Sequence, residues 1–276
     1  MAGKLQDRVA LVSGSGRGIG RAIALKLASE GARVVVNDLD EAPAKETAEA
    51  IRAAGGKAEV CAGSVTEAGF AERFVQTGMD AFGGLDIIVN NAGYTWDSVI
   101  QKMTDEQWYA IIDVHLTAPF RILRAAQPII SALAKEEAAD GREVFRKVVN
   151  ISSIAGTGGN AGQINYSAGK AGILGVTRTM AKEWGRYKVN VNAVAFGPIR
   201  TRLTEGSAKG NSTIKIEDRE IKVGVSPALL TQMEQMIPLG RVGTPEEAAG
   251  AVYLFCAPES NFISGQYVIC GGGFNM

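Results

Sequence analysis

The sequence predicts an α/β fold, a doubly wound parallel sheet of about seven strands with helices on both faces. Two observations lead to this prediction. Short runs rich in β-branched residues alternate with longer segments of helical pattern along the chain of 276 residues. The runs are continuously apolar, which is typical of strands that helices cover on both faces.

The expected strands recur from the N-terminus to the C-terminus. They occupy residues 8–13 (RVALVS), 32–38 (ARVVVND), 57–62 (KAEVCA), 85–91 (LDIIVNN), 145–153 (FRKVVNISS), 189–195 (VNVNAVA) and 266–272 (QYVICGG). Helical patterns fill most of the intervals, at residues 18–30, 40–54, 66–82, 104–138, 163–184 and 244–256. No linker or low-complexity segment interrupts the alternation, so we expect residues 1–276 to form a single domain.

Composition and charge argue against several classes of protein. Lys plus Arg equals Asp plus Glu at 29 each, so the net charge offers no footprint for nucleic acid or for an anionic membrane surface. No apolar run approaches the ~18 residues that a membrane span needs, and the N-terminus MAGKLQDR lacks the apolar core of a signal peptide. We therefore expect a cytoplasmic protein with neither a nucleic acid nor a membrane as its partner.

Cysteine and histidine are scarce. Cys61, Cys256 and Cys270 are odd in number and widely separated, which predicts reduced thiols rather than a disulfide framework. We expect these cysteines to be structural core residues, and a functional thiol is the alternative. His115 is the single histidine, so zinc-binding clusters of His and Cys are absent from the sequence, and no G-x-S-x-G elbow occurs. Zinc dehydrogenases and serine hydrolases are not expected, and neither is a bound metal.

A glycine-rich turn follows the first strand. Gly14, Gly18 and Gly20 form G-x-x-x-G-x-G where the strand leads into a helix. Glycines there let the backbone approach a pyrophosphate, whose charge the helix N-terminus attracts. The second strand ends at Asp38, 18 residues after Gly20, where a carboxylate can accept hydrogen bonds from an adenosine ribose. Together these features predict a bound dinucleotide.

A second motif, INYSAGK at residues 164–170, places Tyr166 and Lys170 four residues apart on one helix face. Ser153, at the end of a strand 13 residues before Tyr166, can reach the same cavity if the helix packs over that strand. A Lys ammonium about 4 Å from a Tyr hydroxyl lowers the tyrosine pKa by about three units at an effective dielectric constant of about 20. Tyr166 is thus expected to exchange a proton near pH 7 while Ser153 binds the substrate oxygen.

The glycine spacing, the motif NNAG at residues 90–93, Ser153, Tyr166 and Lys170 together resemble the short-chain dehydrogenase/reductase family over essentially the whole chain. This resemblance implies a Rossmann-type sheet and hydride transfer between a nicotinamide and a secondary alcohol or ketone. Two segments, IPLGRVGTPEEAAGAVYLF and ISGQYVICGGGF, are most similar to the 3-oxoacyl-thioester reductases. A role in fatty acid metabolism follows from that similarity. General secondary-alcohol, polyol or steroid dehydrogenases of the same family are the alternative, and a non-catalytic dinucleotide sensor is a further one.

The resemblance also implies cofactor contacts at particular positions. Asn91 resembles the residue beside the adenosine ribose, and in FGPIRT the Ile199 backbone and the Thr201 hydroxyl are placed to hold the carboxamide. The full predicted cofactor site comprises Gly14, Arg17, Gly18, Ile19, Gly20, Asp38, Ser64, Val65, Asn91, Ala92, Gly93, Tyr166, Lys170, Pro198, Ile199 and Thr201.

Two positions depart from the family pattern. Ser64 stands where an acidic residue near the adenine is usual, and His115 where a catalytic asparagine is usual. Dehydrogenase modules that act on 3-hydroxyacyl-CoA share both features. His115 is either a proton relay between Lys170 and water or a packed core group, and the backbone bend that the asparagine supports is in doubt here.

The cofactor is expected to be NAD, with NADP possible. Asp38 would repel a 2′-phosphate, whereas Arg17, just before the second glycine, is a residue that often accompanies NADP use in this family. Relatives are commonly tetramers, so we expect a homo-oligomer, a tetramer or a dimer, with the helices at 104–138 and 163–184 at an interface.

Two stretches exceed the short connections of such a fold, residues 134–145 and residues 200 to about 240. In the second, TIKIEDREIKVGV alternates on either side of Glu217, Asp218 and Arg219, which predicts a β-hairpin, and the amphipathic PALLTQMEQMIPLG follows. Such a segment beside the nicotinamide can close over an acyl chain as a lid. A subunit contact is the alternative.

Overall fold

The computed structural model describes residues 3–201, 212–216, 219–223 and 227–274. Its main sheet has seven parallel strands in the order β3-β2-β1-β4-β5-β6-β9. The strands are β1 (Val9–Val12), β2 (Arg33–Val36), β3 (Lys57–Val60), β4 (Ile87–Asn90), β5 (Arg146–Ser153), β6 (Val189–Phe196) and β9 (Tyr267–Cys270). All seven predicted strands are confirmed. The sequence could reveal them because their apolar runs are long enough to be recognised without knowledge of tertiary contacts.

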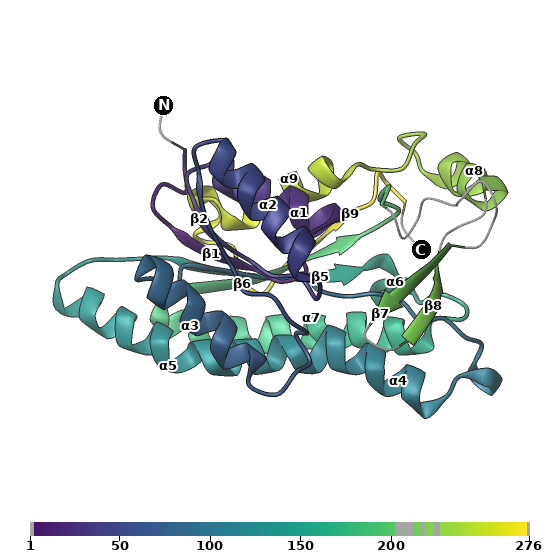
Figure 1. The fold of residues 1–276 in the computed structure, drawn as a ribbon, viewed down its shortest axis with the longest axis horizontal. Coiled ribbons are helices and arrows are strands. Elements are labelled where there is room, and N and C mark those ends of the chain that lie inside the picture. Colours follow the sequence, from purple (N-terminus) through teal and green to yellow (C-terminus); the bar gives the residue numbers. More distant parts are fainter. Residues whose placement is uncertain (1–2, 202–211, 217–218, 224–226, 275–276) are drawn as a thin grey trace.

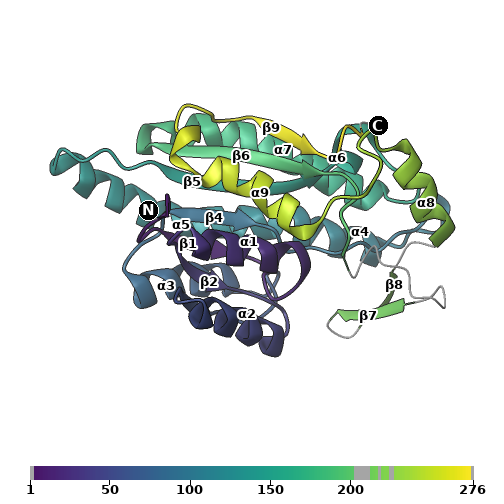
Figure 2. The same ribbon diagram turned by 90° about the horizontal axis from the view of Figure 1, so that it is seen from above.

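Helices cover both faces of the sheet, as predicted (Figures 1 and 2). One layer contains α1 (Gly18–Ser29), α2 (Glu41–Ala53) and α9 (Pro245–Cys256). The other layer contains α3 (Phe70–Phe82), α4 (Asp105–Ile112), α5 (Ala118–Ala139) and α7 (Ile164–Trp184). Strand β1 shows why both faces are apolar: Ala10 and Val12 join the core beneath α1, whereas Leu11 joins the core beneath α3.

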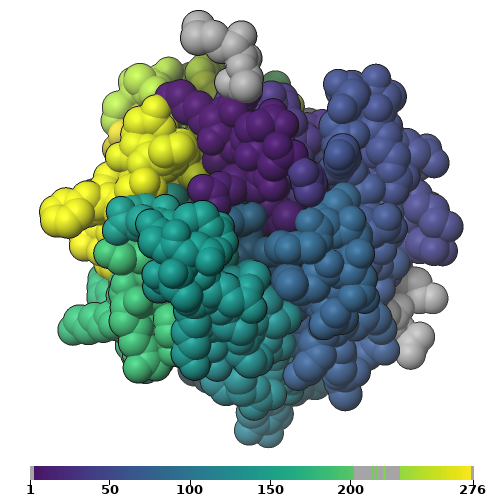
Figure 3. Space-filling view, turned by 90° about the vertical axis from the view of Figure 1, so that its left-hand side faces the viewer, coloured from purple at the N-terminus to yellow at the C-terminus, as the bar shows by residue number. Residues whose placement is uncertain are grey.

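The strand order changes direction between β1 and β4, which is where a doubly wound sheet opens a ligand-binding crevice at the carboxyl ends of its strands. The carboxyl ends of the strands lie at the end of the molecule where α6 (Ile154–Gly158) and the separate hairpin are drawn in Figure 1. Figure 3 looks onto the opposite end, where the purple start of the chain, the teal α5 region and the yellow C-terminal segment lie against one another.

The helix expected at residues 104–138 is interrupted. Helix α4 begins with a capping box between Thr104 and Gln107, and the chain then makes a π-helical turn at Asp113–Thr117 before α5. A π-helical turn adds one residue to the helical repeat, which re-aims the side chains around it. His115 lies in this turn, at the place where the sequence left a backbone bend in doubt.

Other differences from the prediction have local causes. Helix α3 begins at Phe70 rather than at 66 because Gly69, with φ of 78°, ends the preceding turn. Helix α5 continues into the first long stretch as far as Ala139, and the buried Arg146 pairs with Glu137 at 2.6 Å, which fixes the return to the sheet. Helix α6 was not predicted. The remaining short helical turns are Ile100–Lys102, Gly185–Tyr187 and Pro258–Ser260.

The second long stretch contains the predicted hairpin and helix. Strands β7 (Ser212–Ile216) and β8 (Arg219–Val223) pair antiparallel, and α8 (Pro227–Met236) follows. Glu217 and Asp218, at the predicted turn, lie outside the described residues. Figure 2 shows the hairpin standing apart from the main sheet.

Candidate active site

One cavity of about 880 Å³ opens at the carboxyl ends of the parallel strands. Every residue that the sequence predicted for the cofactor site and for catalysis lines this cavity. They are Gly14, Arg17, Gly18, Ile19, Gly20, Asp38, Ser64, Val65, Asn91, Ala92, Gly93, His115, Ser153, Tyr166, Lys170, Pro198, Ile199 and Thr201. Segments separated by up to 187 residues in the chain, from Gly14 to Thr201, thus meet around one space.

The glycine turn depends on the absence of side chains. Gly14 has φ of 62°, and a Cβ there would lie 2.7 Å from the Ala92 Cα. A Cβ at Gly20 would lie 2.0 Å from the Gly14 carbonyl oxygen. Larger residues would push the turn away from the first turn of α1, whose free backbone amides face an anion most favourably.

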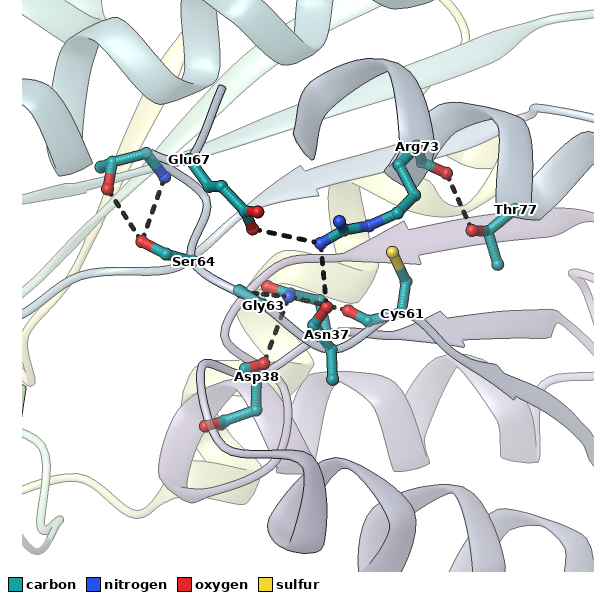
Figure 4. Close-up of polar contacts among 10 residues, drawn as sticks. Asn37, Asp38, Cys61, Gly63, Ser64, Glu67, Arg73 and Thr77 are labelled. Carbon is teal, nitrogen blue, oxygen red and sulfur yellow. Dashed lines mark hydrogen bonds and ion pairs between the residues drawn. The ribbon is translucent and has the colours of Figure 1, made fainter. Parts of the chain in front are cut away.

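Asn37 holds this turn in place and was missed by sequence reasoning. Its Oδ1 accepts a hydrogen bond from the Gly14 amide at 3.0 Å, while its Nδ2 donates to the carbonyl oxygens of Cys61 at 2.9 Å and Gly63 at 3.0 Å. Figure 4 shows Asn37 between β2 and the loop after β3. The available signal in the sequence was an asparagine directly after an apolar strand. The structure shows that this asparagine is buried, where a polar side chain needs hydrogen-bond partners.

Asp38 is held in position by two backbone amides. Its Oδ2 accepts from Gly16 at 3.1 Å and its Oδ1 from Asp40 at 3.2 Å. Burial raises the pKa of the Asp38 carboxyl, an effect that these two amides and the nearby Arg17 charge oppose. A Cβ at Gly16 would lie 2.6 Å from Asp38 Oδ2, so only glycine fits beside the carboxylate.

The loop after β3 forms another wall of the cavity, near Asp38. The Ser64 hydroxyl lies 2.8 Å from the Thr66 hydroxyl, and Arg73 supports the loop from α3 by donating to the Ala62 carbonyl at 3.1 Å and pairing with Glu67 at 3.4 Å. Figure 4 shows Arg73 reaching over Gly63, opposite Asp38. Ser64, which stands in place of an acidic residue, therefore lies in a loop that Arg73 holds in position.

Asn91 is largely committed to the protein itself. Its Nδ2 donates to the carbonyl oxygens of Ser13 at 2.9 Å and Gly14 at 3.0 Å, although the residue lines the cavity. On the other side, the segment of Pro198, Ile199 and Thr201 is attached to Gly243: the Gly243 amide donates to the Pro198 carbonyl at 3.0 Å. Both contacts fix the walls of the cavity.

Ser153 and Tyr166 form the centre of the deeper part. Ser153 ends β5 and caps α6, where its Oγ accepts from the Ala155 amide at 3.2 Å. Tyr166 lies in the first turn of α7, and its side chain hydrogen-bonds with that of Ser153. The two hydroxyls therefore converge, as the prediction that α7 packs over β5 requires.

The expected effect of Lys170 on Tyr166 is wrong for the chain by itself. Burial raises the pKa of Tyr166 to about 12, against the opposing Ser153 hydrogen bond. Burial also lowers the pKa of Lys170 to about 7, so the lysine is only partly charged at neutral pH. Its Nζ donates to the Ile151 carbonyl at 2.8 Å and lies 5.6 Å from the centre of the Tyr166 ring. Desolvation therefore affects the pKa of Tyr166 more strongly than the Lys170 charge, which the four-residue spacing alone had suggested would dominate.

His115 packs against Tyr166. The two rings meet edge to face at 88°, with centroids 5.0 Å apart. The His115 Nε2 lies 2.7 Å from the Tyr94 carbonyl oxygen, to which a neutral ring donates. Burial lowers the pKa of His115 well below its usual value, and the Lys170 charge adds to this effect. A Cβ at Gly93 would lie 2.1 Å from His115 Cε1, so this glycine of NNAG makes room for the ring.

His115 Nδ1 is buried and has no hydrogen-bond partner among the described residues. A neutral ring with its Nε2 proton on Tyr94 presents Nδ1 as an acceptor only. This geometry favours a fixed, uncharged ring over an imidazolium that takes up and releases protons.

The far end of the cavity contains residues that the sequence did not single out. Asp97 is exposed and lines the cavity, and desolvation raises the pKa of its carboxyl against the hydrogen bond from Gln163. Gln163, three residues before Tyr166, donates to Asp97 Oδ2 at 2.8 Å. Tyr109 and Glu106 from α4 line the same end. No motif marks them, because they come from the loop after β4, from α4 and from the residue before α7, which only the complete fold brings together.

The residues present fit a nicotinamide dinucleotide. The glycine turn leaves a cradle that any side chain would fill, Asp38 is positioned by two amides at one end, and the Ser153 and Tyr166 hydroxyls converge at the other. When bound, such a cofactor donates or accepts a hydride. In the described part of the chain, no group of three or more His, Cys, Asp or Glu residues could hold a metal ion.

Fold and site together define a nicotinamide-dependent oxidoreductase. A family model described as enoyl-(acyl carrier protein) reductase matches residues 14–275. The chain belongs to the short-chain dehydrogenase/reductase family, and it is an NAD(P)-dependent enzyme.

Several relatives match almost the full length. The chain is 38% identical to a 3-oxoacyl-[acyl-carrier-protein] reductase of Synechocystis sp. over 99% of its length and 98% of the relative. It is 37% identical to the 3-oxoacyl-[acyl-carrier-protein] reductase FabG of Vibrio cholerae, over 99% of both chains. A short-chain dehydrogenase/reductase mutant of Serratia marcescens has a similar structure, with a TM-score of 0.82 and 28% identity over 99% of this chain and all of that one. No described helix is long and apolar enough to cross a membrane.

Proposed function

We propose that the enzyme reduces 3-oxoacyl thioesters to 3-hydroxyacyl thioesters, with NAD(H) as its cofactor. The observation that carries the proposal is the convergence of the Ser153 and Tyr166 hydroxyls, beside Lys170, in the cavity that the glycine turn and Asp38 also line. The full-length similarity to 3-oxoacyl-[acyl-carrier-protein] reductases supports the substrate class.

The proposed mechanism follows from the two hydroxyls. The carbonyl oxygen of the substrate accepts hydrogen bonds from Ser153 and Tyr166 while hydride reaches the carbonyl carbon. As negative charge develops on that oxygen, Tyr166 gives it a proton, and the carbonyl becomes a secondary alcohol. A pKa of about 12 keeps Tyr166 protonated at neutral pH, which suits the acid that reduction requires. Lys170 then offsets the charge left on the Tyr166 oxygen.

A substrate panel tests this proposal. Acetoacetyl and longer 3-oxoacyl thioesters of N-acetylcysteamine, CoA and acyl carrier protein are compared with simple ketones, polyols and steroids by nicotinamide absorbance. We expect the highest kcat/KM for 3-oxoacyl thioesters. If simple alcohols, polyols or steroids surpass every acyl thioester, the enzyme is instead a general secondary-alcohol, polyol or steroid dehydrogenase.

The cofactor proposal rests on Asp38. Its carboxylate would lie against the 2′-phosphate of NADP, and at about 4 Å and a dielectric constant of about 20 each pair of charges repels by ~4 kcal/mol, or roughly 10³ in affinity. Screening and Arg17 reduce this value. We therefore expect kcat/KM for NADH to exceed that for NADPH by at least about tenfold, and the reverse preference would contradict the proposal.

The segment from 200 to about 240 is proposed as the substrate lid. Thr201, near the start of this segment, and Ile216, the last residue of β7, both line the cavity. An apolar Ile216 side chain at the cavity suits contact with an acyl chain.

We further propose a cytoplasmic homo-oligomer, a tetramer or a dimer. The three free cysteines, two of them buried, are compatible with a reducing compartment.

A further inference from the structure

Three charged side chains gather at the end of the cavity where Asp38 lies. They are Arg17, Asp38 and Asp40, and all three line the cavity. Two carboxylates against one guanidinium leave this end with one excess negative charge. That charge balance alone disfavours a second phosphate group.

The three side chains are joined by a specific arrangement. Arg17 is the N-cap residue of α1 and Asp40 is the N-cap residue of α2. The Arg17 Nη2 lies 2.9 Å from Asp40 Oδ2, and the Asp40 amide donates to Asp38 Oδ1 at 3.2 Å. Asp40 thus holds the Arg17 side chain through its carboxylate and the Asp38 side chain through its backbone.

The pairing changes what Arg17 can do. A guanidinium matches the geometry of a phosphate with two parallel hydrogen bonds, so an unpaired arginine beside Asp38 would attract a 2′-phosphate. An arginine that is already paired with a carboxylate must first give up that partner. The tension between Arg17, which suits NADP, and Asp38, which suits NAD, is resolved by the contact with Asp40.

We propose that Asp40 is a specificity-determining residue, which holds Arg17 in an ion pair and so withholds it from the 2′-phosphate of NADP. The proposal rests on the proposed NAD(H) dependence and assigns part of that preference to a residue that acts through Arg17. Both partners of the pair are about half exposed, at 43% and 55% of their side-chain surface. An exposed ion pair predicts a modest effect.

The test uses adenosine 2′,5′-bisphosphate and adenosine 5′-monophosphate, which differ only in the 2′-phosphate, with calorimetric titration of the full-length protein. We expect Asp40→Asn to raise the affinity for the bisphosphate about three- to fivefold relative to the monophosphate, or ~0.7–1 kcal/mol. In an Arg17→Ala background the same Asp40→Asn change should give no such gain, because the freed guanidinium is missing.

Glu41→Gln is the matched control. It removes the same charge from the first turn of α2, where Glu41 pairs with Lys45 at 3.0 Å and does not line the cavity, so the affinity ratio should stay unchanged. A gain that persists in Asp40→Asn/Arg17→Ala would mean that Asp40 acts only through its own charge, and no gain in Asp40→Asn would mean that the pair has no role. Either result overturns the proposal.

The kcat/KM values of the wild-type enzyme for NADH and NADPH separate this inference from the function it rests on. A preference for NADPH would overturn the proposed cofactor, while the calorimetric cycle would still decide the role of Asp40. A preference for NADH with no effect of Asp40→Asn would leave the proposed cofactor intact and remove only the Asp40 assignment.

Discussion

At the scale of single residues, the protonation state of Tyr166 determines whether its side chain can donate a proton for carbonyl reduction or accept one for alcohol oxidation. Its pKa of about 12 reflects burial, and the adjacent lysine does not reverse this effect in the chain alone. A half-buried tyrosine that stays protonated is ready to act as an acid toward a carbonyl oxygen, whereas alcohol oxidation needs the tyrosinate. In the chain alone, the raised pKa of Tyr166 therefore favours the proton donation that the proposed reduction needs.

Tyr166→Phe removes the hydroxyl and keeps the ring that packs against His115. We expect turnover to fall by at least ~10²-fold, the lower end of the effect of general acid-base groups. Binding of NADH, followed by its fluorescence, should remain within about twofold. Tyr187→Phe, in the short turn Gly185–Tyr187 away from the cavity, is the matched control and should keep full turnover. Near-normal activity of Tyr166→Phe would exclude the proposed mechanism.

For His115, the structure distinguishes two roles that the sequence left open. A buried neutral ring that donates to the Tyr94 carbonyl is expected to stay uncharged around neutral pH, because burial and the Lys170 charge hold its pKa well below its usual value. We expect His115→Ala to lower both kcat and the melting temperature, since Tyr166 loses its packing partner. The pH at which kcat/KM is half-maximal should not move. A shift of that pH with an unchanged melting temperature would support a proton relay instead.

At the scale of elements, the π-helical turn at Asp113–Thr117 shows where sequence patterns stop being informative. The apolar pattern from 104 to 138 is continuous, so it predicts one helix. The turn depends on contacts of His115 with Tyr94 and Tyr166, from a loop and from another helix. Asn37 and the pair of Asp97 and Gln163 were missed for the same reason, because their partners are distant in the chain.

The hairpin β7–β8 carries a prediction of its own. Deleting residues 211–225 removes both strands and the Ile216 side chain from the cavity wall. We expect KM for a 3-oxoacyl thioester to rise at least about tenfold, while KM for the cofactor changes less than about twofold, because the cofactor walls come from the main sheet. Light scattering of the same variant checks the subunit-contact alternative. Dissociation of the oligomer with an unchanged substrate KM would favour that alternative.

At the scale of the whole molecule, the sequence predicted the architecture and the membership of the cavity better than the electrostatics inside it. Strands and the glycine turn follow from local composition, and parallel strands bring their carboxyl ends together by construction. The pKa of Tyr166 depends on how much water the complete fold removes, which no spacing reports. Burial is a property of the folded chain, so its consequences can be tested through folding.

Lys170 provides that test. In the folded protein burial lowers its pKa to about 7, whereas in the unfolded chain it keeps its ordinary value near 10.5. Between these values the unfolded state binds more protons, so this group makes the free energy of unfolding rise with pH. Its destabilising effect is complete below about pH 7 and disappears as pH approaches 10.5. Lys170→Met, of similar length and uncharged, removes the effect.

We therefore expect Lys170→Met to unfold at a higher temperature than the wild type at pH 7, by about 2–4 °C for each kcal/mol gained. The advantage should shrink steadily toward pH 9.5. Taking the difference between the two proteins cancels other groups, such as Lys147, whose pKa burial lowers to about 8. A difference in melting temperature that stays constant from pH 6 to pH 9.5 would show that Lys170 is not desolvated in the folded enzyme. The raised pKa of Tyr166 would then need a test of its own, because Lys170 is buried whereas Tyr166 is half-buried and lines the cavity.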